Sequence, residues 1–152
     1  MDAVKELSEE AVGEILKDVF STMVNLPLEL VPLQPPVTQP SATAIIGIIG
    51  KPGKLVVLRA CEELACAIAG GMLMAEYSAW GDDVRDAFSE LANMTAGNIK
   101  AKCFTESGFS LSLPTVIFGG DYKMSSARLR TVLELSMGSG GGILQVSVAE
   151  EI

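Results

Sequence analysis

Residues 42–60, ATAIIGIIGKPGKLVVLRA, decide the fold of this 152-residue chain. Two runs rich in Ile, Val and Leu, at 42–50 and 54–60, flank the turn signal Gly50-Lys51-Pro52-Gly53 and so predict a β-hairpin. The same glycines and lysines superficially suggest a phosphate-binding loop. That loop needs Ser or Thr after the lysine and a helix after the loop. Here neither lysine is followed by a hydroxyl residue and a strand pattern comes next, so the hairpin is the better interpretation.

The sequence before the hairpin predicts a helix and then an irregular segment. Apolar residues at helical spacing run through 2–25, with acidic residues on the other face. Five of the seven prolines follow, within 27–40. Proline cannot donate to a strand ladder, so this segment should be irregular or form an edge strand.

The sequence after the hairpin predicts two helices and then more strands. The run 61–76 is apolar nearly all round and should form a buried helix. A second helix is expected over 83–102, with Asp82 as its N-cap. The remaining strand patterns lie at 110–119, 127–137 and 142–149, the last two joined by a flexible glycine-rich connection at 138–142. The order α-β-β-β-α-α-β-β-β predicts one α+β domain over 1–152, its mostly antiparallel sheet packed against long helices.

Composition excludes several classes of function. Eleven Lys and Arg against nineteen Asp and Glu give a formal charge of −8, which argues against a protein that binds the phosphate backbone of nucleic acids. The chain has no histidine, which excludes Ser-His-Asp and Cys-His catalysis and histidine-ligated metals. Any chemistry must use carboxylates, amides, hydroxyls or groups of a partner.

The cysteines and the apolar runs predict a cytoplasmic protein without a membrane span. Cys61, Cys66 and Cys103 contain no Cys-x-x-Cys pair and are expected to be reduced, mostly buried thiols. The N-terminal residues lack the basic and then apolar pattern of a signal peptide. The longest uncharged apolar run, 64–75, is much shorter than the roughly 20 residues that a membrane helix needs.

The expected helix 83–102 has an unusual polar face. Its apolar stripe should face the core and consists of Val84, Phe88, Leu91, Ala92, Thr95 and Ile99. The opposite stripe carries Asp86, Glu90 and Asn93 without a basic partner, and then the small residues Gly97 and Ala101. Glycine inside a helix costs about 1 kcal/mol relative to Ala. A flat, open surface beside two polar side chains is typical of a docking surface, although a charged helix face is most often merely solvated.

The string Asp86-x3-Glu90-x2-Asn93-x3-Gly97-Asn98 resembles the signature of the chemotaxis phosphatase family of CheC, CheX and FliY. In that family Asp or Ser is followed by Glu and Asn on one helix, with a proline downstream, and Pro114 lies near the corresponding place. The order of elements is also similar over most of the chain. CheC-type members usually carry two such motifs and this chain carries one, so it looks most like the stand-alone, single-site CheX.

The resemblance implies hydrolysis of the aspartyl phosphate on a CheY-type receiver domain. In it Asn93 would orient the attacking water, Glu90 would pair with the receiver's lysine, and Asp86 and Gly97 would contact the partner. The phosphatase would need no cofactor of its own, because the phosphorylated receiver brings the Mg²⁺. Phosphoryl transfer needs mostly positioning and charge stabilisation, so the missing histidine is no obstacle.

Two expectations remain open beside this one. The chain could be a non-catalytic CheX-like binding or adaptor module in chemotaxis or two-component signalling, which would bind a receiver without turnover. A homodimer is also expected, since CheX-type members dimerise through sheet edges. The alternating strand 142–149 would be a template for such pairing if it lay at an edge.

Overall fold

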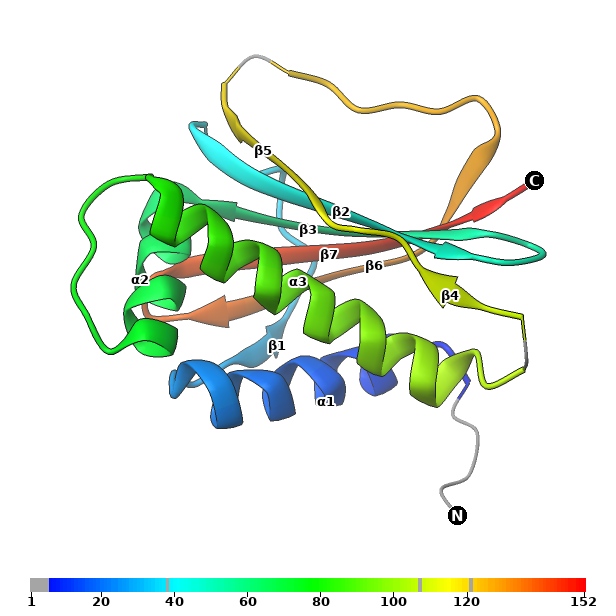
Figure 1. Ribbon diagram of the computed structural model, residues 1–152, viewed down its shortest axis with the longest axis horizontal. Helices are drawn as coiled ribbons and strands as arrows, with labels where there is room; N and C mark the ends of the chain where they lie inside the picture. Colours follow the sequence, from blue (N-terminus) through cyan, green and yellow to red (C-terminus); the bar gives the residue numbers. More distant parts are fainter. Residues whose placement is uncertain (1–5, 38, 107, 121) are drawn as a thin grey trace.

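The computed structural model describes residues 6–37, 39–106, 108–120 and 122–152. It has two layers, an antiparallel sheet and a layer of helices that covers one face of it (Figure 1). The path of the sheet is β1-β6-β7-β3-β2-β4, and β5 also pairs with β2. The predicted α+β class and the antiparallel sheet are therefore confirmed.

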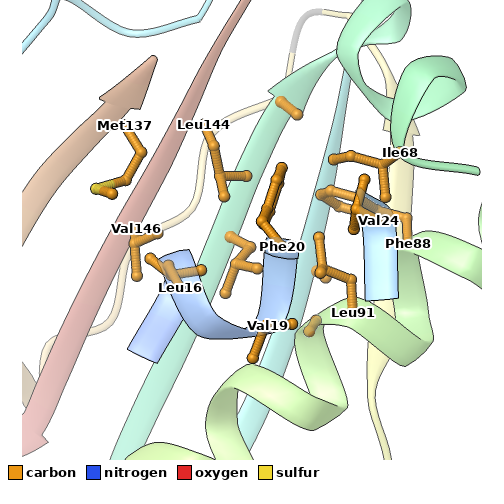
Figure 2. Packing of buried hydrophobic residues seen from close by; sticks show 14 of the residues in the cluster. Leu16, Val19, Phe20, Val24, Ile68, Phe88, Leu91, Met137, Leu144 and Val146 are labelled. Atoms are coloured by element: carbon orange, nitrogen blue, oxygen red, sulfur yellow. The ribbon is translucent and has the colours of Figure 1, made fainter. Parts of the chain in front are cut away.

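The predicted hairpin forms the centre of the sheet. β2 (Ser41–Ile49) pairs antiparallel with β3 (Lys54–Cys61), with Ile46 opposite Val56 and Ala44 opposite Leu58. Successive side chains of a strand point to opposite faces, so these four buried residues share the face beneath the helices. The core between the layers also takes large side chains from the helices, among them Phe20, Phe88 and Leu91, which Figure 2 shows close together.

The first helix is shorter than predicted and ends in a wider turn. α1 spans Glu9–Val19, and Ser8 caps it by accepting a hydrogen bond from the Ala11 N–H at 3.1 Å. The start of the expected helix, 2–5, lies outside the described residues. A π-helical turn, η1 (Phe20–Val24), follows α1. The wider turn breaks the 3.6-residue period, and Met23, which continued the apolar stripe in sequence, is exposed.

The proline-rich segment 27–40 was predicted to be irregular or to form an edge strand, and it contributes one short edge strand. β1 (Glu29–Val31) is at the edge of the sheet and pairs with β6 (Leu129–Ser139). Residues 34–37 run over the sheet face that the helices leave uncovered. Its backbone is held there by Gln145, whose amide donates to the carbonyls of Gln34 and Pro35 at 3.2 and 2.7 Å.

The second helix packs closely against the π-helical turn η1 through a glycine. α2 (Glu62–Leu73) buries Leu64, Ile68 and three small residues, in agreement with the predicted buried helix. A Cβ at Gly71 would lie 2.0 Å from the Val24 carbonyl oxygen. This contact leaves no room for a side chain, so α2 and η1 approach each other at van der Waals distance only because residue 71 is glycine.

The C-terminal strands differ from the prediction in two respects. The strand expected at 110–119 is two strands, β4 (Ser110–Leu111) and β5 (Thr115–Gly119), interrupted where Pro114 cannot donate. The connection expected at 138–142 is much tighter, because β6 and β7 (Gly142–Glu151) stay paired up to Ser139 opposite Gly142. The glycines therefore form a short turn, not a flexible loop.

The position of β7 removes the edge proposed for dimer formation. β7 lies between β6 and β3 and is paired on both sides, so it offers no free ladder. The edges of the sheet are β1 on one side and β4 with β5 on the other. The homodimer itself stays a prediction, and any pairing of sheets would have to use one of these other strands.

Candidate functional site on helix α3

The candidate residues lie on α3 (Asp82–Cys103), the longest helix of the described chain. Its N-cap is Gly81, and no side chain caps the first turn. The prediction of Asp82 as N-cap was therefore wrong by one residue: Asp82 is the first helical residue and its carboxylate accepts from Arg85 at 3.3 Å. Two acidic residues in this first turn still favour the positive end of the helix dipole.

The buried face of α3 fixes which residues point outward. All six residues of the predicted apolar stripe are buried, and so are Ala87 and Ala96. The Thr95 hydroxyl donates back to the Leu91 carbonyl at 2.8 Å, which satisfies this buried polar group within the helix. With this face packed on the sheet and on α1 and α2, the opposite face must carry the candidate residues to the surface.

Asp86, Glu90, Asn93 and Gly97 form one line along that outer face. At about 100° per residue the four positions fall within an arc of roughly 60°, and Asp86 and Asn93 are about 10 Å apart along the axis. Asp86 and Glu90 are exposed, whereas Asn93 and Gly97 are half-buried. The helix thus places all four predicted residues on one surface.

Asp86 has a basic partner that the sequence analysis missed. The Nε and Nη2 of Arg85 both approach Asp86 Oδ1 at 3.0 Å. Hydrogen bonding and the charge of Asp86 raise the pKa of the Arg85 guanidinium above its already high value. The negative charge of Asp86 is therefore partly neutralised, and the line is not the wholly unpartnered ladder that was predicted.

Glu90 and Asn93 differ from Asp86 in having no internal partner. Within the described parts of the chain, neither side chain makes a hydrogen bond or an ion pair. The nearby Asn98 behaves differently, since its amide donates to the Met94 carbonyl at 2.8 Å. A carboxylate and a carboxamide one helical turn apart are thus free to bind groups of another molecule.

Gly97 is less open than predicted. A Cβ there would lie 3.6 Å from Leu111 Cδ1, so β4 runs beside the helix at this point. That distance is an ordinary van der Waals contact, and the protein's own packing does not require glycine at 97. Ala101, one turn further, is exposed. The flat surface therefore extends from Glu90 to Gly97 and is bounded on one side by β4.

Two cavities lined by the described residues lie elsewhere. The larger, of about 820 Å³, opens on the sheet face opposite the helices, where outward side chains of β3, β6 and β7 line it. Neither cavity includes a candidate residue of α3. In the described residues, no group of three or more Asp, Glu or Cys side chains could hold a metal ion. The candidate residues thus lie on the outer surface of α3 and border neither of these cavities.

The helix α2 carries no second copy of the motif, because Ala65 and Cys66 stand three residues after Glu62 and Glu63. Glu62 begins α2, and its carboxylate accepts a hydrogen bond from the Trp80 N–H at 2.9 Å. Trp80 in turn stacks on Phe118 with ring centroids 4.5 Å apart. Glu62 thus holds the connection between α2 and α3 in place, in agreement with the single motif in the sequence.

No helix of the described chain combines the length and hydropathy of a membrane span.

Comparison with solved structures places the fold among chemotaxis proteins. CheX from Vibrio vulnificus matches with a TM-score of 0.80 at 22% identity, over 99% of this chain and 100% of that one. CheX from Borrelia burgdorferi, solved in a complex with CheY, BeF₃ and Mg²⁺, matches with a TM-score of 0.77 at 19% identity, over 97% and 100%. The middle domain of FliM from Helicobacter pylori is more distant, with a TM-score of 0.62 at 11% identity, over 95% and 94%. No curated protein matches the sequence.

The family model described as chemotaxis phosphatase CheX matches residues 42–137. The match covers more than half of the chain and contains the whole of α3 with Glu90 and Asn93. The resemblance first seen in the motif thus extends over the hairpin, α2, α3, β4, β5 and most of β6. This chain belongs to the CheX family of chemotaxis phosphatases.

Proposed function

We propose that this protein hydrolyses the aspartyl phosphate of a CheY-type receiver domain, with Glu90 and Asn93 completing the receiver's active site. The proposal rests on the side chains of Glu90 and Asn93. In a member of the CheX family, an exposed carboxylate and a half-buried carboxamide stand on one helix face without partners among the described residues. They project from a surface, where only a partner's site can receive them.

Asn93 has the role of positioning water. An aspartyl phosphate is an acyl phosphate and is already reactive, so in-line placement of a water molecule is the main requirement. A carboxamide can both accept from and donate to that water without changing its charge. The water oxygen bonds to phosphorus, the bond from phosphorus to the aspartyl oxygen breaks, and the products are inorganic phosphate and the free carboxylate.

Glu90 has the role of fixing the register of the complex. It lies about 4.5 Å before Asn93 along the helix axis. A carboxylate at that distance can pair with the active-site lysine of a receiver while Asn93 reaches the phosphoryl group. Asp86, tied to Arg85, would make a contact at the rim, and Gly97 would let the receiver approach the helix closely. Mg²⁺ would come with the receiver, as it accompanies CheY and BeF₃ in the complex with the Borrelia CheX.

The second candidate function is a CheX-like adaptor that binds a receiver without turnover. The likeness to the FliM middle domain leaves room for it, because this fold is shared with a protein of another name and does not by itself identify an enzyme. The pair argues for the enzyme, since binding alone does not need an unpartnered amide beside the carboxylate. The two candidates differ in whether phosphate is released repeatedly.

Phosphate release from a phosphorylated receiver, with the protein at a small fraction of the receiver's concentration, separates these functions. We expect many phosphates released per molecule of wild-type protein, and none above the receiver's own rate with Asn93→Ala. Asn98→Ala is the matched control, because the same amide is removed from the same helix, but that amide donates to Met94. Tight receiver binding without accelerated release would identify the adaptor instead.

A further inference from the structure

The polypeptide from β4 to β5 runs alongside α3 in the opposite direction (Figure 1). Two contacts fix this arrangement. Near the end of α3, Leu111 is close enough to touch a Cβ at Gly97. Just before the start of α3, Phe118 stacks on Trp80. The strand segment between Leu111 and Phe118 must therefore pass beside the helix that carries the candidate site.

The rise per residue shows which strand residue lies level with Asn93. A strand advances about 3.3 Å per residue and a helix about 1.5 Å. β4 and β5 both pair with β2, Leu111 opposite Ile48 and Thr115 opposite Ile45, so the four steps from Leu111 to Thr115 advance over three steps of β2, about 10 Å. Leu113 is midway, about 5 Å from the level of Leu111, and Asn93 is about 6 Å back from Gly97 along the helix axis. The same rises per residue place Phe118 level with the helix start, where its stack on Trp80 is found. Leu113 therefore lies about level with Asn93, on the side of α3 where Leu111 meets Gly97.

Leu113 is exposed to an extent unusual for leucine. Its exposed fraction is 89%, although it follows a strand that packs on the helix. The backbone that carries it is held in place. The Gly47 N–H donates to Ser112 Oγ, and the Ser112 N–H donates to the Gly47 carbonyl, both at 2.8 Å. Pro114 restricts the chain on the other side. An apolar side chain is thus presented at a fixed position beside the site.

We propose that Leu113 is a docking residue that contacts an apolar side chain next to the phosphorylation site of the receiver. The inference rests on the proposed function, since it is continuity with Glu90 and Asn93 that selects a receiver as the occupant. Glu90 and Asn93 on α3 supply polar contacts to the receiver, and Leu113 on the neighbouring segment between β4 and β5 supplies an apolar contact. Gly97, one helical turn beyond Asn93, keeps the adjoining surface low enough for both to be reached at once.

Truncation of Leu113 tests the proposal through the split between KM and kcat. With Leu113→Ala we expect KM for the phosphorylated receiver to rise about 10-fold, equivalent to about 1.4 kcal/mol, with kcat unchanged. Leu113→Asp should raise KM further. Leu33→Asp is the control of equal charge, because Leu33 is 61% exposed and borders the cavity on the opposite sheet face. It should leave both constants unchanged.

A binding measurement separates failure of this inference from failure of the proposed function. The probe is a CheY-type receiver loaded with Mg²⁺ and beryllium fluoride, and the measured quantity is its Kd. Weaker binding by Leu113→Ala supports the docking role even if wild type shows no turnover, a result that would overturn the phosphatase alone. Normal turnover with KM and Kd within twofold of wild type in both Leu113 variants would overturn the docking role and leave the phosphatase standing.

Discussion

Gly97→Ala should make the protein more stable. Alanine in a helix interior is favoured over glycine by about 1 kcal/mol. The new Cβ would lie 3.6 Å from Leu111 Cδ1, a normal contact that asks for no rearrangement. The free energy of unfolding should therefore rise by about 1 kcal/mol, and Tm by about 2–4 °C for a domain of this size.

Gly71→Ala is the matched change with the opposite sign. It gains the same helix propensity, but its Cβ would lie 2.0 Å from the Val24 carbonyl oxygen, so η1 or α2 must move. Overpacking of this kind costs about 1–3 kcal/mol or more, and a net loss of about 2 kcal/mol is expected.

Urea unfolding followed by circular dichroism measures both variants, with the slope m checked for two-state behaviour. A fall in stability for Gly97→Ala would refute the reasoning, because it would mean that α3 and β4 need glycine for their own packing. A higher free energy of unfolding for Gly97→Ala would mean that glycine at this position makes the protein less stable than alanine would. Close approach of a partner then explains the glycine, and a larger side chain, as in Gly97→Gln, should raise KM for the receiver.

Two further predictions concern the first helix and the buried thiol. Ser8→Ala removes the hydrogen bond to the Ala11 N–H and should lower the free energy of unfolding by about 1 kcal/mol, seen as a lower urea midpoint at unchanged m; an unchanged midpoint would show that the cap contributes nothing. Burial raises the pKa of the Cys66 thiol, and the charges of Glu62 and Cys61 raise it further. Because the folded state holds the proton more tightly, the contribution of Cys66 to stability should be fully present below pH 9.0, the ordinary thiol pKa, and be lost as the pH rises above it, so that wild type and Cys66→Ala differ in their pH dependence only above that pH. Cys66 should also react with iodoacetamide more slowly than the other two thiols when followed by mass spectrometry at pH 8, and modification of Cys66 first would contradict its burial.

The apolar stripe of α3 could be predicted from the sequence because helical periodicity is a local property. Residues at spacings of three and four share a face whatever the rest of the chain does, and all six predicted positions are buried. The outward position of Glu90 and Asn93 follows from the same rule. The hairpin could be predicted equally well, since its two strands are adjacent in sequence and joined by a turn signal.

The errors arose where the answer depends on geometry that periodicity does not contain. Neighbouring residues on a helix are not expected to face each other, so the pairing of Arg85 with Asp86 left no signal in the spacing. The cover over Gly97 depends on where β4 lies in space, far along the chain. The interior place of β7 is likewise a property of the sheet order, which an alternating pattern cannot reveal.

The most direct test of the central claim is kcat for the loss of phosphate from a phosphorylated receiver, measured with this protein saturated by that receiver and compared between wild type and Asn93→Ala. Saturation removes any effect on binding, so the comparison isolates what the amide does in the complex. The proposed role predicts that Asn93→Ala still binds the receiver loaded with Mg²⁺ and beryllium fluoride, while its kcat falls to the receiver's own rate of dephosphorylation. A kcat close to that of wild type would contradict the assignment of Asn93 as the residue that orients the attacking water.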